Sequence, residues 1–390
     1  MLTFKAFDGI NNVLPAKRLE PSEFVRALNV DIGLSKELTR RSGYSEVLGT
    51  CHKNLWQASG FMLATCDGDL TAIWPNATRT VIYAGLGVER VWYCNLPDGR
   101  TTFSNGLIQG VTDGATLTGW GVPVPERIGT LSQAAGQLYP GDYQYQIAYV
   151  RLSDGLEGGP EYSNPFPVTQ GGVLIHGLPV RDGYSIRVYL SSHDGGEAYY
   201  AGTTLTDEFS FTGKNSDLVI PARTDLVYPA PALATVQAFY RGRVLVAEGN
   251  VLYASKHQQV EFFERKRDYK QFAAPITLIV PVDDGVYVGT ENELAFLAGQ
   301  SFDTLQYRQV LSSGVVLGSG VPVRGDMVKL GDGRGQGSAM LCIADSVICA
   351  GFNSGQLVRL TEGRYSTNAT EVAATFRKIN GVPQYLAIPQ

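Results

Sequence analysis

Turn-forming dipeptides recur along the whole chain and separate short runs of β-branched and aromatic residues. An aspartate or asparagine followed by glycine stands at Asp8-Gly9, Asp67-Gly68, Asp98-Gly99, Asn105-Gly106, Asp113-Gly114, Asp154-Gly155, Asp182-Gly183, Asp194-Gly195, Asp284-Gly285 and Asp332-Gly333. Such pairs supply the positive φ angles that tight hairpin turns require. No long segment carries a sustained apolar period of 3.6 residues, which a helix would need. The sequence therefore predicts an almost entirely β protein.

Five segments share one plan, in which an apolar strand, a polar turn with glycine or asparagine and a second apolar strand follow one another. They begin at Leu55, Val91, Ala238, Ile276 and Ser338, so their starts are about 36, 147, 38 and 62 residues apart. If the long gap holds an insertion of about 110 residues, most spacings lie near the roughly 40 residues of a propeller blade. A strand pair cannot bury both of its faces, whereas radially stacked sheets can. We therefore expect a small β-propeller of about five blades.

Proline-rich stretches bound the insertion. "GVPVPERIG" precedes it and "VYPAPALAT" follows it, and prolines of this density resist the continuation of a sheet. Aromatic and polar residues alternate inside, and this part resembles a fibronectin type III-like sandwich. The expected division is an arm with a first hairpin (1–47), a first propeller part (48–122), the inserted sandwich (123–230) and a second propeller part (231–390).

The first 47 residues fit neither a signal peptide nor a disordered tail. Polar residues and proline interrupt every apolar run, so there is no secretory h-region, and the last residues are not a prenylation signal. These observations lead us to expect a cytosolic protein. Alternation over residues 25–32 followed by Gly33 predicts two short strands around a turn. The preceding residues predict an extended arm, whose apolar side chains lie on another surface.

Charge and cysteine content exclude several classes of protein. The net charge of -5 argues against a protein that grips nucleic acid, because that affinity comes from Lys and Arg. A surface that lets DNA pass without binding it remains compatible. No apolar stretch approaches the length of a membrane helix. The cysteines are odd in number, with five in the chain and no CxxC pair, which favours buried free thiols over disulfides or zinc ligation.

Candidate catalytic groups are few. The four histidines lie on separate segments, and no Gly-x-Ser-x-Gly elbow or P-loop is present. We therefore predict no catalytic, cofactor-binding or metal-binding residues. Asp283 and Asp284, with Glu291 and Glu293 nearby, form the densest carboxylate cluster. Two carboxylates on a propeller face can act as acid and base in a glycosidase, but Asp-Asp-Gly between apolar strands also suits a hairpin turn.

Two further groups of residues leave alternatives open. The segment "FFERKRDYK" carries Arg265, Lys266, Arg267 and Lys270, which suit a phosphate or an acidic neighbour, a solvated loop or a subunit contact. The tryptophans Trp56, Trp92 and Trp120 would suit sugar stacking if they faced the same site as Asp283 and Asp284. A carbohydrate-binding or glycoside-cleaving propeller is therefore the alternative function.

The order of parts resembles a known family. An arm "FDGINNVLP", a hairpin "FVRALNVDIG…ELTRRSGY", blade-like repeats, an inserted fibronectin-like module and a closing "ATFRKINGVPQYLA" follow one another. This plan resembles the β-propeller tail proteins of tailed bacteriophages, including the nozzle proteins of short-tailed phages. The likeness is specific mainly in the first 47 and the last 20 residues. The chain departs from the larger nozzle proteins in being short.

The resemblance implies a virion structural protein without catalytic activity or cofactor. It implies a homo-oligomeric ring around the DNA exit channel, with six copies favoured and three possible. Its partners would be neighbouring tail or head-tail adaptor proteins, with DNA passing unbound and no membrane insertion. The protein would reside in the virion tail, and in the host cytoplasm during assembly. We expect the subunit interface to include Phe4, Phe7, Ile10, Val13, Leu14, Arg40, Arg41, Arg265, Lys266 and Arg267.

Overall fold

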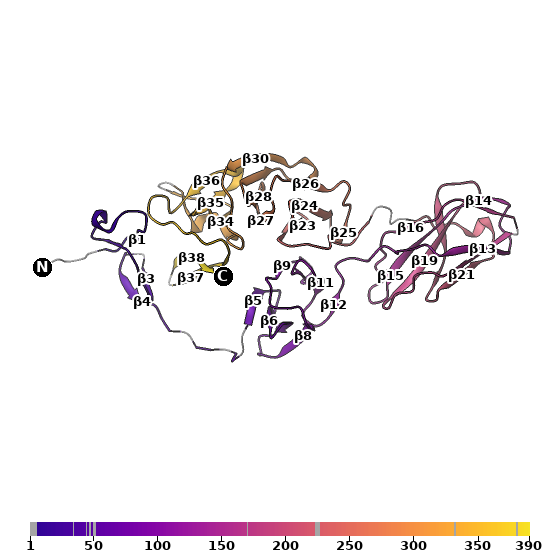
Figure 1. Cartoon of the computed structure of the whole chain (residues 1–390), viewed down its shortest axis with the longest axis horizontal. Helices are drawn as coiled ribbons and strands as arrows, with labels where there is room; N and C mark the ends of the chain where they lie inside the picture. The colour runs from indigo at the N-terminus through magenta and orange to yellow at the C-terminus, as the bar shows by residue number, and fades with distance from the viewer. Residues whose placement is uncertain are drawn as a thin grey trace. The chain divides into compact units, whose positions relative to one another are not determined.

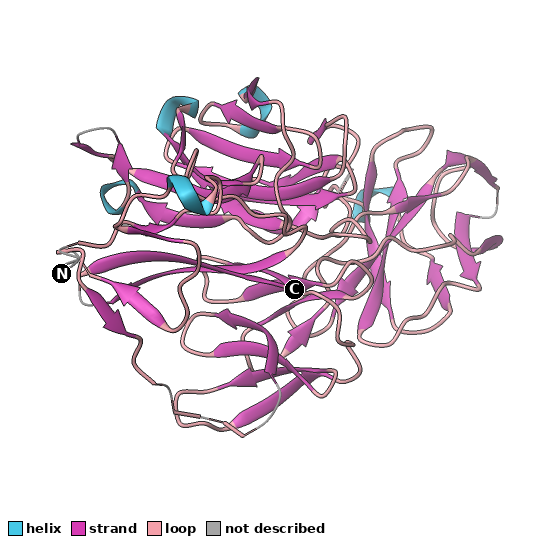
Figure 2. Cartoon of the chain, turned by 60° about the vertical axis from the view of Figure 1, so that its left-hand side comes forward, coloured by secondary structure: helices cyan, strands magenta, loops and turns pink. Residues whose placement is uncertain are grey.

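The structure is a computed structural model that describes residues 6–33, 35–43, 45–46, 48–49, 52–169, 171–222, 227–330, 333–379 and 381–390. Strands dominate it, as the turn pattern predicts (Figure 2). The described helices are single 3-10 turns, namely η1 (Ala16–Arg18), η2 (Asn215–Asp217), η3 (Phe302–Thr304), η4 (Gly325–Met327) and η5 (Asn353–Gly355). No helix in this part of the chain has the length and apolar character needed to span a membrane.

The chain divides into two compact units. Unit 1 comprises Met1–Leu117, Ala232–Tyr253 and Tyr269–Gln390, and unit 2 comprises Thr118–Pro231 and Ala254–Asp268. Unit 2 thus takes in the proline-bounded insertion together with a second, short segment. No proline or glycine signal in the sequence marks that second segment.

Five sheets follow one another along unit 1, and each contains one of the five repeat segments (Figure 1). The first consists of β5 (His52–Gln57), β6 (Met62–Cys66), β7 (Asp69–Ile73) and β8 (Arg79–Tyr83), and the second of β9 (Trp92–Asn95), β10 (Thr101–Ser104), β11 (Gln109–Thr112) and β12 (Leu117–Thr118). The third consists of β22 (Gln237–Tyr240), β23 (Arg243–Glu248), β24 (Val251–Lys256) and β26 (Tyr269–Gln271), and β24 also pairs with β25 (Gln259–Phe263).

The fourth and fifth sheets complete this series. The fourth consists of β27 (Ile276–Val282), β28 (Gly285–Thr290), β29 (Leu294–Ala298) and β30 (Gln306–Leu311). The fifth consists of β31 (Val321–Arg324), β34 (Ser338–Ala344), β35 (Val347–Phe352) and β36 (Leu357–Arg359), with a small pair, β32 (Lys329–Leu330) and β33 (Gly333–Arg334), between its first two strands. Most strands that are neighbours in these sheets are also neighbours in the sequence, and several of them are joined by tight turns.

Sheets that are consecutive in the chain also contact one another. Leu63 and Leu70 of the first sheet share a buried core with Phe103 of the second. Strand β22 lies against β9, β27 lies against β22, and β31 and β34 lie against β27. Tyr287 of the fourth sheet and Met340 of the fifth belong to one buried cluster. Each of the first four sheets therefore contacts the sheet that follows it in the sequence.

A last hairpin ends the chain. Strands β37 (Val372–Ile379) and β38 (Val382–Pro389) pair over their whole length, and Phe376 and Tyr385 pack against the fifth sheet. The start of this hairpin contacts the segment between the first and second sheets. There Arg90 Nε donates to Glu371 Oε1 at 2.6 Å, and Arg90 Nη2 donates to the Val372 carbonyl at 2.7 Å.

Residues 6–33 and 35–43 form a small substructure, which we call the N-terminal module. Strand β1 (Gly9–Ile10) pairs in parallel with β2 (Glu23–Phe24). Strand β3 (Val30–Ile32) pairs antiparallel with β4 (Leu38–Arg40), so the hairpin predicted after residue 25 is confirmed. The rings of Phe7 and Phe24 stack with their centroids 5.2 Å apart.

Unit 2 is built around a β-sandwich. One sheet contains β13 (Thr130–Ala135), β18 (Gly171–His176) and β21 (Glu208–Phe211), and the other contains β16 (Glu161–Tyr162), β15 (Tyr145–Arg151), β19 (Tyr184–Ser191) and β20 (Ala198–Thr204). A short pair is formed by β14 (Gly141–Tyr143) and β17 (Phe166–Val168). Ile175 of the first sheet and Ile147 and Val188 of the second share the core. Facing sheets that interdigitate in this way define a sandwich.

Candidate functional site

The paired asparagines of the arm have separate structural roles. Asn11 is buried, and its Oδ1 accepts hydrogen bonds from the backbone amides of Val13 and Leu14 at 3.2 and 3.1 Å. Its Nδ2 donates to Glu23 Oε1 at 3.0 Å. An asparagine that bonds amides two and three residues on forms a turn without glycine. Asn11 therefore bends the arm and attaches it to β2.

Asn12 connects the arm to a distant loop of unit 1. Its Oδ1 accepts the Ser366 amide at 2.8 Å, and its Nδ2 donates to the Ser366 carbonyl at 2.8 Å. The Asn12 backbone amide donates to the Arg364 carbonyl at 3.0 Å. A carboxamide carries a donor and an acceptor side by side, so it can pair with both backbone groups of one residue, as a neighbouring strand does.

The predicted interface residues of the arm differ in exposure. Phe7 packs on Phe24 within the module, and Ile10 is half-buried in β1. Val13 and Leu14 remain exposed, at 45% and 41%. Phe4 lies outside the described residues. Val13 and Leu14 are therefore the apolar side chains of the arm that remain available to a neighbour.

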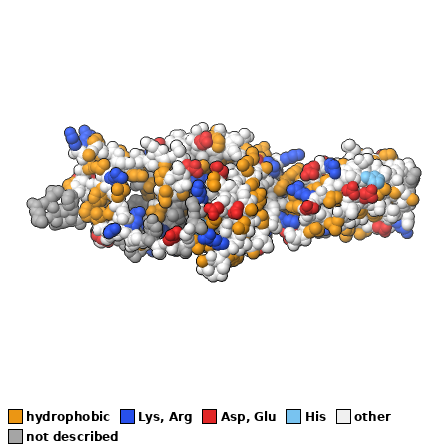
Figure 3. All heavy atoms as spheres, turned by 60° about the horizontal axis from the view of Figure 1, so that its bottom comes forward, with side chains coloured by type: hydrophobic (Ala, Val, Ile, Leu, Met, Phe, Trp, Pro, Cys, Tyr) orange, Lys and Arg blue, Asp and Glu red, His pale blue; other side chains and the backbone are white. Residues whose placement is uncertain are grey.

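Other apolar side chains of the N-terminal module also face solvent. Val25, Leu28 and Leu38 are exposed together with Val13 and Leu14. On the face drawn in Figure 3, hydrophobic side chains gather on the N-terminal part of unit 1. Single exposed apolar residues are ordinary, but a concentration of them on a small module marks a surface for contact.

The two arginines expected at the interface lie at the end of the β3–β4 hairpin. Arg40 is exposed at the end of β4. Arg41 donates from Nε and Nη2 to Asp31 Oδ1 at 3.1 and 2.9 Å. Across the module, hydrogen bonds from Lys36 and Ser22 lower the pKa of Asp8. The Lys36–Asp8 pair attaches the residue before β1 to the hairpin, and the Arg41–Asp31 pair lies within the hairpin, so the module has its own internal contacts.

The basic segment of unit 2 is mostly paired within the chain. Arg267 bonds Glu264 at 2.9 Å and the buried carboxylate of Asp268 at 2.8 Å. Arg265 is half-buried, and Lys266 is exposed. Lys256 approaches Glu264 to 3.8 Å. Acidic neighbours therefore balance part of the positive charge of this segment.

A buried ion pair fixes this segment to the sandwich. Arg151 Nη2 lies 2.8 Å from Glu261 Oε2, and the two side chains are only 5% and 8% exposed. Arg151 also bonds Asp154 at 2.6 Å and the Gly119 carbonyl at 2.9 Å. Burial alone would lower the pKa of Arg151, but its bonds to Asp154 and Glu261 outweigh that effect and raise it.

Asp283 and Asp284 form the two-residue turn between β27 and β28, which confirms the hairpin-turn interpretation. Asp283 accepts hydrogen bonds from the Ser338 amide at 2.8 Å and from Asn353 Nδ2 at 3.0 Å. Asp284 accepts from the Ser354 amide at 2.7 Å. Hydrogen bonds from the Ser338 hydroxyl and amide and from Asn353 lower the pKa of Asp283. These hydrogen bonds join the β27–β28 turn of the fourth sheet to Ser338 of the fifth sheet and to the turn after β35.

Of the tryptophans considered for sugar stacking, Trp120 is buried, whereas Trp56 is 37% exposed and Trp92 is half-buried. Trp120 is 2% exposed, and its Nε1 donates to the Val260 carbonyl at 3.0 Å. Trp56 stacks on Tyr93 with centroids 5.7 Å apart and donates to Asn95 at 2.8 Å. A buried ring cannot stack on a saccharide, so Trp120 is excluded from a sugar-binding role.

Sequence reasoning missed a hydrogen-bonded chain on the three-stranded sheet of unit 2. Ser132 Oγ lies 3.1 Å from His176 Nε2, and His176 Nδ1 lies 3.1 Å from Glu208 Oε1. Serine hydrolases use a serine, histidine and carboxylate in this order. Here Ser132 stands mid-strand, paired with Leu174, and not on a sharp turn with converging amides, as an oxyanion hole requires. No local sequence motif predicts this hydrogen-bonded triplet, because only the register of the strands brings Ser132, His176 and Glu208 together.

The described cysteines are free and buried, namely Cys66, Cys94, Cys342 and Cys349, which confirms the prediction of buried free thiols for these four. Burial raises the pKa of Cys94 to about 12 and that of Cys342 well above its usual range. Cys51 lies outside the described residues. In the part of the chain that the structure describes, no group of three or more His, Cys, Asp or Glu side chains is placed to hold a metal ion.

Comparisons with known proteins give weak likenesses. No family model matches the chain, and no curated protein matches it. Among solved structures, BBS1N in complex with ARL6DN is 11% identical with a TM-score of 0.35, covering 88% of this chain and 91% of that chain. BamB from Moraxella catarrhalis is 10% identical with a TM-score of 0.33, covering 92% and 90%. Catalytically inactive virginiamycin B lyase from Staphylococcus aureus is 7% identical with a TM-score of 0.31, covering 87% and 92%. At these TM-scores the likenesses carry no argument about this chain.

Proposed function

We propose that this chain is a non-enzymatic structural protein of a bacteriophage tail, of the nozzle or tail-tip kind. In this proposal unit 1 is a five-bladed β-propeller, and unit 2 is a fibronectin type III-like sandwich inserted between the second and third blades. Support for the propeller comes from the five sheets, each of which contacts the next in chain order, and from the contact of Arg90 with Glu371. Radial stacking of such sheets buries both faces of each.

The observation that carries the proposal is the exposed apolar surface of the N-terminal module. Val13, Leu14, Val25 and Leu28 face solvent in the isolated chain. A ring requires two different, complementary patches on each subunit, and an apolar module at one end of the chain provides one of them. The side chains that could have carried chemistry, such as Asp283 and Trp120, are engaged in internal hydrogen bonds.

The proposed assembly surrounds the DNA exit channel, with six copies favoured and three possible. Neighbouring tail or head-tail adaptor proteins contact its two rims, in the virion and during assembly in the host cytoplasm. DNA passes through the channel without being bound. The net charge of -5 supports this, because negative surface repels the phosphate backbone.

Light scattering and negative-stain imaging of the purified full chain test the proposal. Uniform hollow rings are expected, and the double substitution Val13→Ser/Leu14→Ser should shift them toward monomers. Leu107→Ser is the matched control, because Leu107 is 78% exposed on the second sheet and outside the module. A chain that stays monomeric alone and with its neighbouring tail proteins would overturn the proposal, and a glycan screen would then be the next experiment.

A further inference from the structure

The contact between Asn12 and the loop at residues 364–366 joins parts of the chain that are 354 residues apart. It consists of three hydrogen bonds. Two, both 2.8 Å long, join the side-chain amide of Asn12 to the backbone of Ser366, and the third, 3.0 Å long, joins the Asn12 backbone amide to the Arg364 carbonyl. The positive charge of Arg364 also helps to lower the pKa of Asp8, after the larger effects of hydrogen bonds from Lys36 and Ser22. Residues 364–366 thus bind the arm through hydrogen bonds to Asn12, and we call these residues the receptor loop.

The N-terminal module also has contacts of its own, separate from those with the receptor loop. Phe7 stacks on Phe24, Asn11 bonds Glu23, and Lys36 bonds Asp8. All of these contacts lie within residues 6–43. None of these contacts involves the receptor loop, so an exchange of the module between copies would not have to break them.

The connection to the rest of unit 1 permits such an exchange. Eleven residue steps separate Arg41, whose amide bonds Asn29, from His52 at the start of β5. At about 3.3–3.6 Å per residue, an extended chain of this length spans roughly 36–40 Å. That distance is comparable to the diameter of a small domain. The arm can thus reach a receptor loop on an adjacent copy.

We infer that in the assembled ring Asn12 of each copy docks on the Ser366 backbone of the next copy. The inference rests on the proposed ring function and names the partner surface within it. Each copy then donates one module and receives another, which is the head-to-tail arrangement that closes a ring. Docking in the isolated chain leaves Val13 and Leu14 beside the receptor but exposed. Docking between copies brings these side chains into the interface, where burying them favours assembly.

Directed crosslinking separates the two modes of docking. Val13→Cys on a tagged copy and Arg364→Cys on an untagged copy place thiols beside the contact and keep both Asn12 and Ser366. Val13 and Arg364 are exposed in the isolated chain, and cysteine keeps a small apolar side chain at position 13, so rings of the two variants are expected to form. The two full-length chains are co-expressed, the ring fraction is isolated and a short bismaleimide is added. A tagged and untagged pair at twice the 42.2 kDa of one chain is the expected product.

Three controls make the outcome decisive. Wild-type rings report any crosslinking by the native cysteines, and each single variant alone should give no pair above that background. A chain carrying both substitutions reports docking within one copy, which leaves the mass of the denatured chain unchanged. Rings that crosslink only within single chains overturn the inference and leave the proposed function standing. A protein that forms no rings at all overturns the proposed function itself.

Discussion

The side-chain amide of Asn12 forms both of its hydrogen bonds with the backbone of Ser366, at 2.8 Å each. An asparagine in the arm thus imitates the backbone of a paired strand and attaches the first residues of the chain to a loop near its end. Alanine cannot make these bonds, and aspartate keeps the acceptor but loses the donor.

Replacing Asn12 with alanine should therefore free the receptor loop. Exposed hydrogen bonds of this kind contribute about 1–2 kcal/mol together, so exchange at the Ser366 amide should rise roughly fivefold to 30-fold. Hydrogen exchange with mass spectrometry of peptides covering residues 360–371 measures this effect. Asn76→Ala is the control, since Asn76 bonds only within its own turn at Thr78. Unchanged protection in Asn12→Ala would show that the contact does not hold the loop.

Removing Arg151 from its buried pair with Glu261 should destabilise unit 2. The substitution Arg151→Met removes the guanidinium from a carboxylate that is 8% exposed, and breaking a buried ion pair in this way costs about 3–5 kcal/mol. The denaturant dependence of hydrogen exchange in peptides from β15 and β25 reports this change. Asp154→Asn should cost much less, because that carboxylate is largely solvated. Equal losses in the two variants would contradict the assigned role of the buried pair.

The turn carboxylate of Asp283 should stabilise the protein in a pH-dependent way. Its pKa is lowered in the folded chain, first by the Ser338 hydroxyl, so its contribution is complete above the unfolded value of about 3.9 and is lost as the pH falls through the folded value. Asp283→Asn should lower the melting temperature by roughly 1–3 °C near pH 6, and by less near pH 3.5.

A matched substitution separates this effect from general acid destabilisation. Asp67 is an exposed carboxylate in the β6–β7 turn, so Asp67→Asn removes the same charge from a turn within one sheet. Calorimetric scans of the three proteins across this pH range give the comparison. If Asp283→Asn lowered the melting temperature relative to the wild type by the same amount at every pH, the charge of Asp283 would not be what joins the two sheets.

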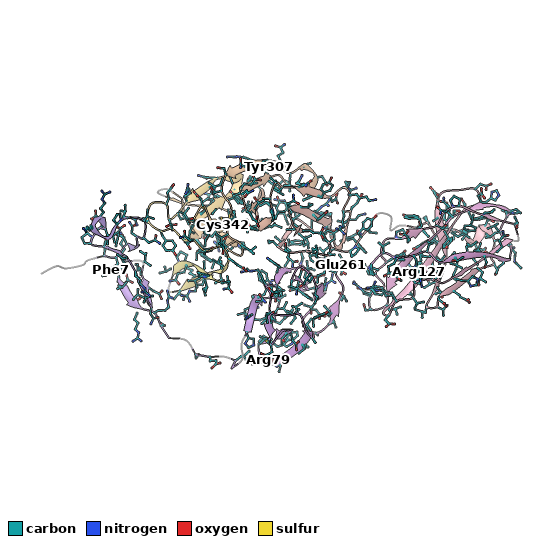
Figure 4. All side chains as sticks on the ribbon, in the orientation of Figure 1. Phe7, Arg79, Arg127, Glu261, Tyr307 and Cys342 are labelled. Carbon is teal, nitrogen blue, oxygen red and sulfur yellow. The ribbon has the colours of Figure 1, made fainter. Side chains whose placement is uncertain are left out.

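The buried thiols should be inert in the folded protein. Burial raises the pKa of Cys94 to about 12 and that of Cys349 to about 11, and a thiol with a raised pKa holds little of the reactive thiolate at pH 8. N-ethylmaleimide should modify less than about a tenth of Cys94, Cys342 and Cys349 in an hour, and all five cysteines in strong urea. Figure 4 places Cys342 within the fifth sheet. Rapid labelling of Cys342 in native conditions would mean that this sheet opens.

The hydrogen-bonded side chains of Ser132, His176 and Glu208 should have no hydrolytic activity. Its members are within hydrogen-bond distance, but a serine in the middle of a paired strand has no oxyanion hole to stabilise the tetrahedral intermediate. A fluorophosphonate probe should label the wild type no more than Ser132→Ala. Labelling that both Ser132→Ala and His176→Ala abolish would overturn the proposal of a non-enzymatic protein.

Local chemistry explains what sequence reasoning could predict at the level of fold. Glycine-containing turns and alternating apolar residues act over a few positions, so the all-β character and the β3–β4 hairpin follow from the residues themselves. The Asp283-Asp284 turn was likewise predictable from its own tripeptide. The segment at residues 254–268 was not, because its place in unit 2 depends on Glu261 and Val260 meeting partners far away in the sequence.

The sequence by itself therefore determined the strands, the turns and the repeated units of this protein, since these depend on neighbours within one hairpin. The tertiary structure alone decided which distant residues meet. Asn12 forms hydrogen bonds with Ser366, which lies 354 residues away in the sequence. The pairs Arg151–Glu261 and Ser132–His176 are separated by 110 and 44 residues. Such pairs depend on strand register and on the packing of one sheet or loop against another. A one-residue shift in register reverses the face on which a side chain lies, and no local pattern encodes that choice.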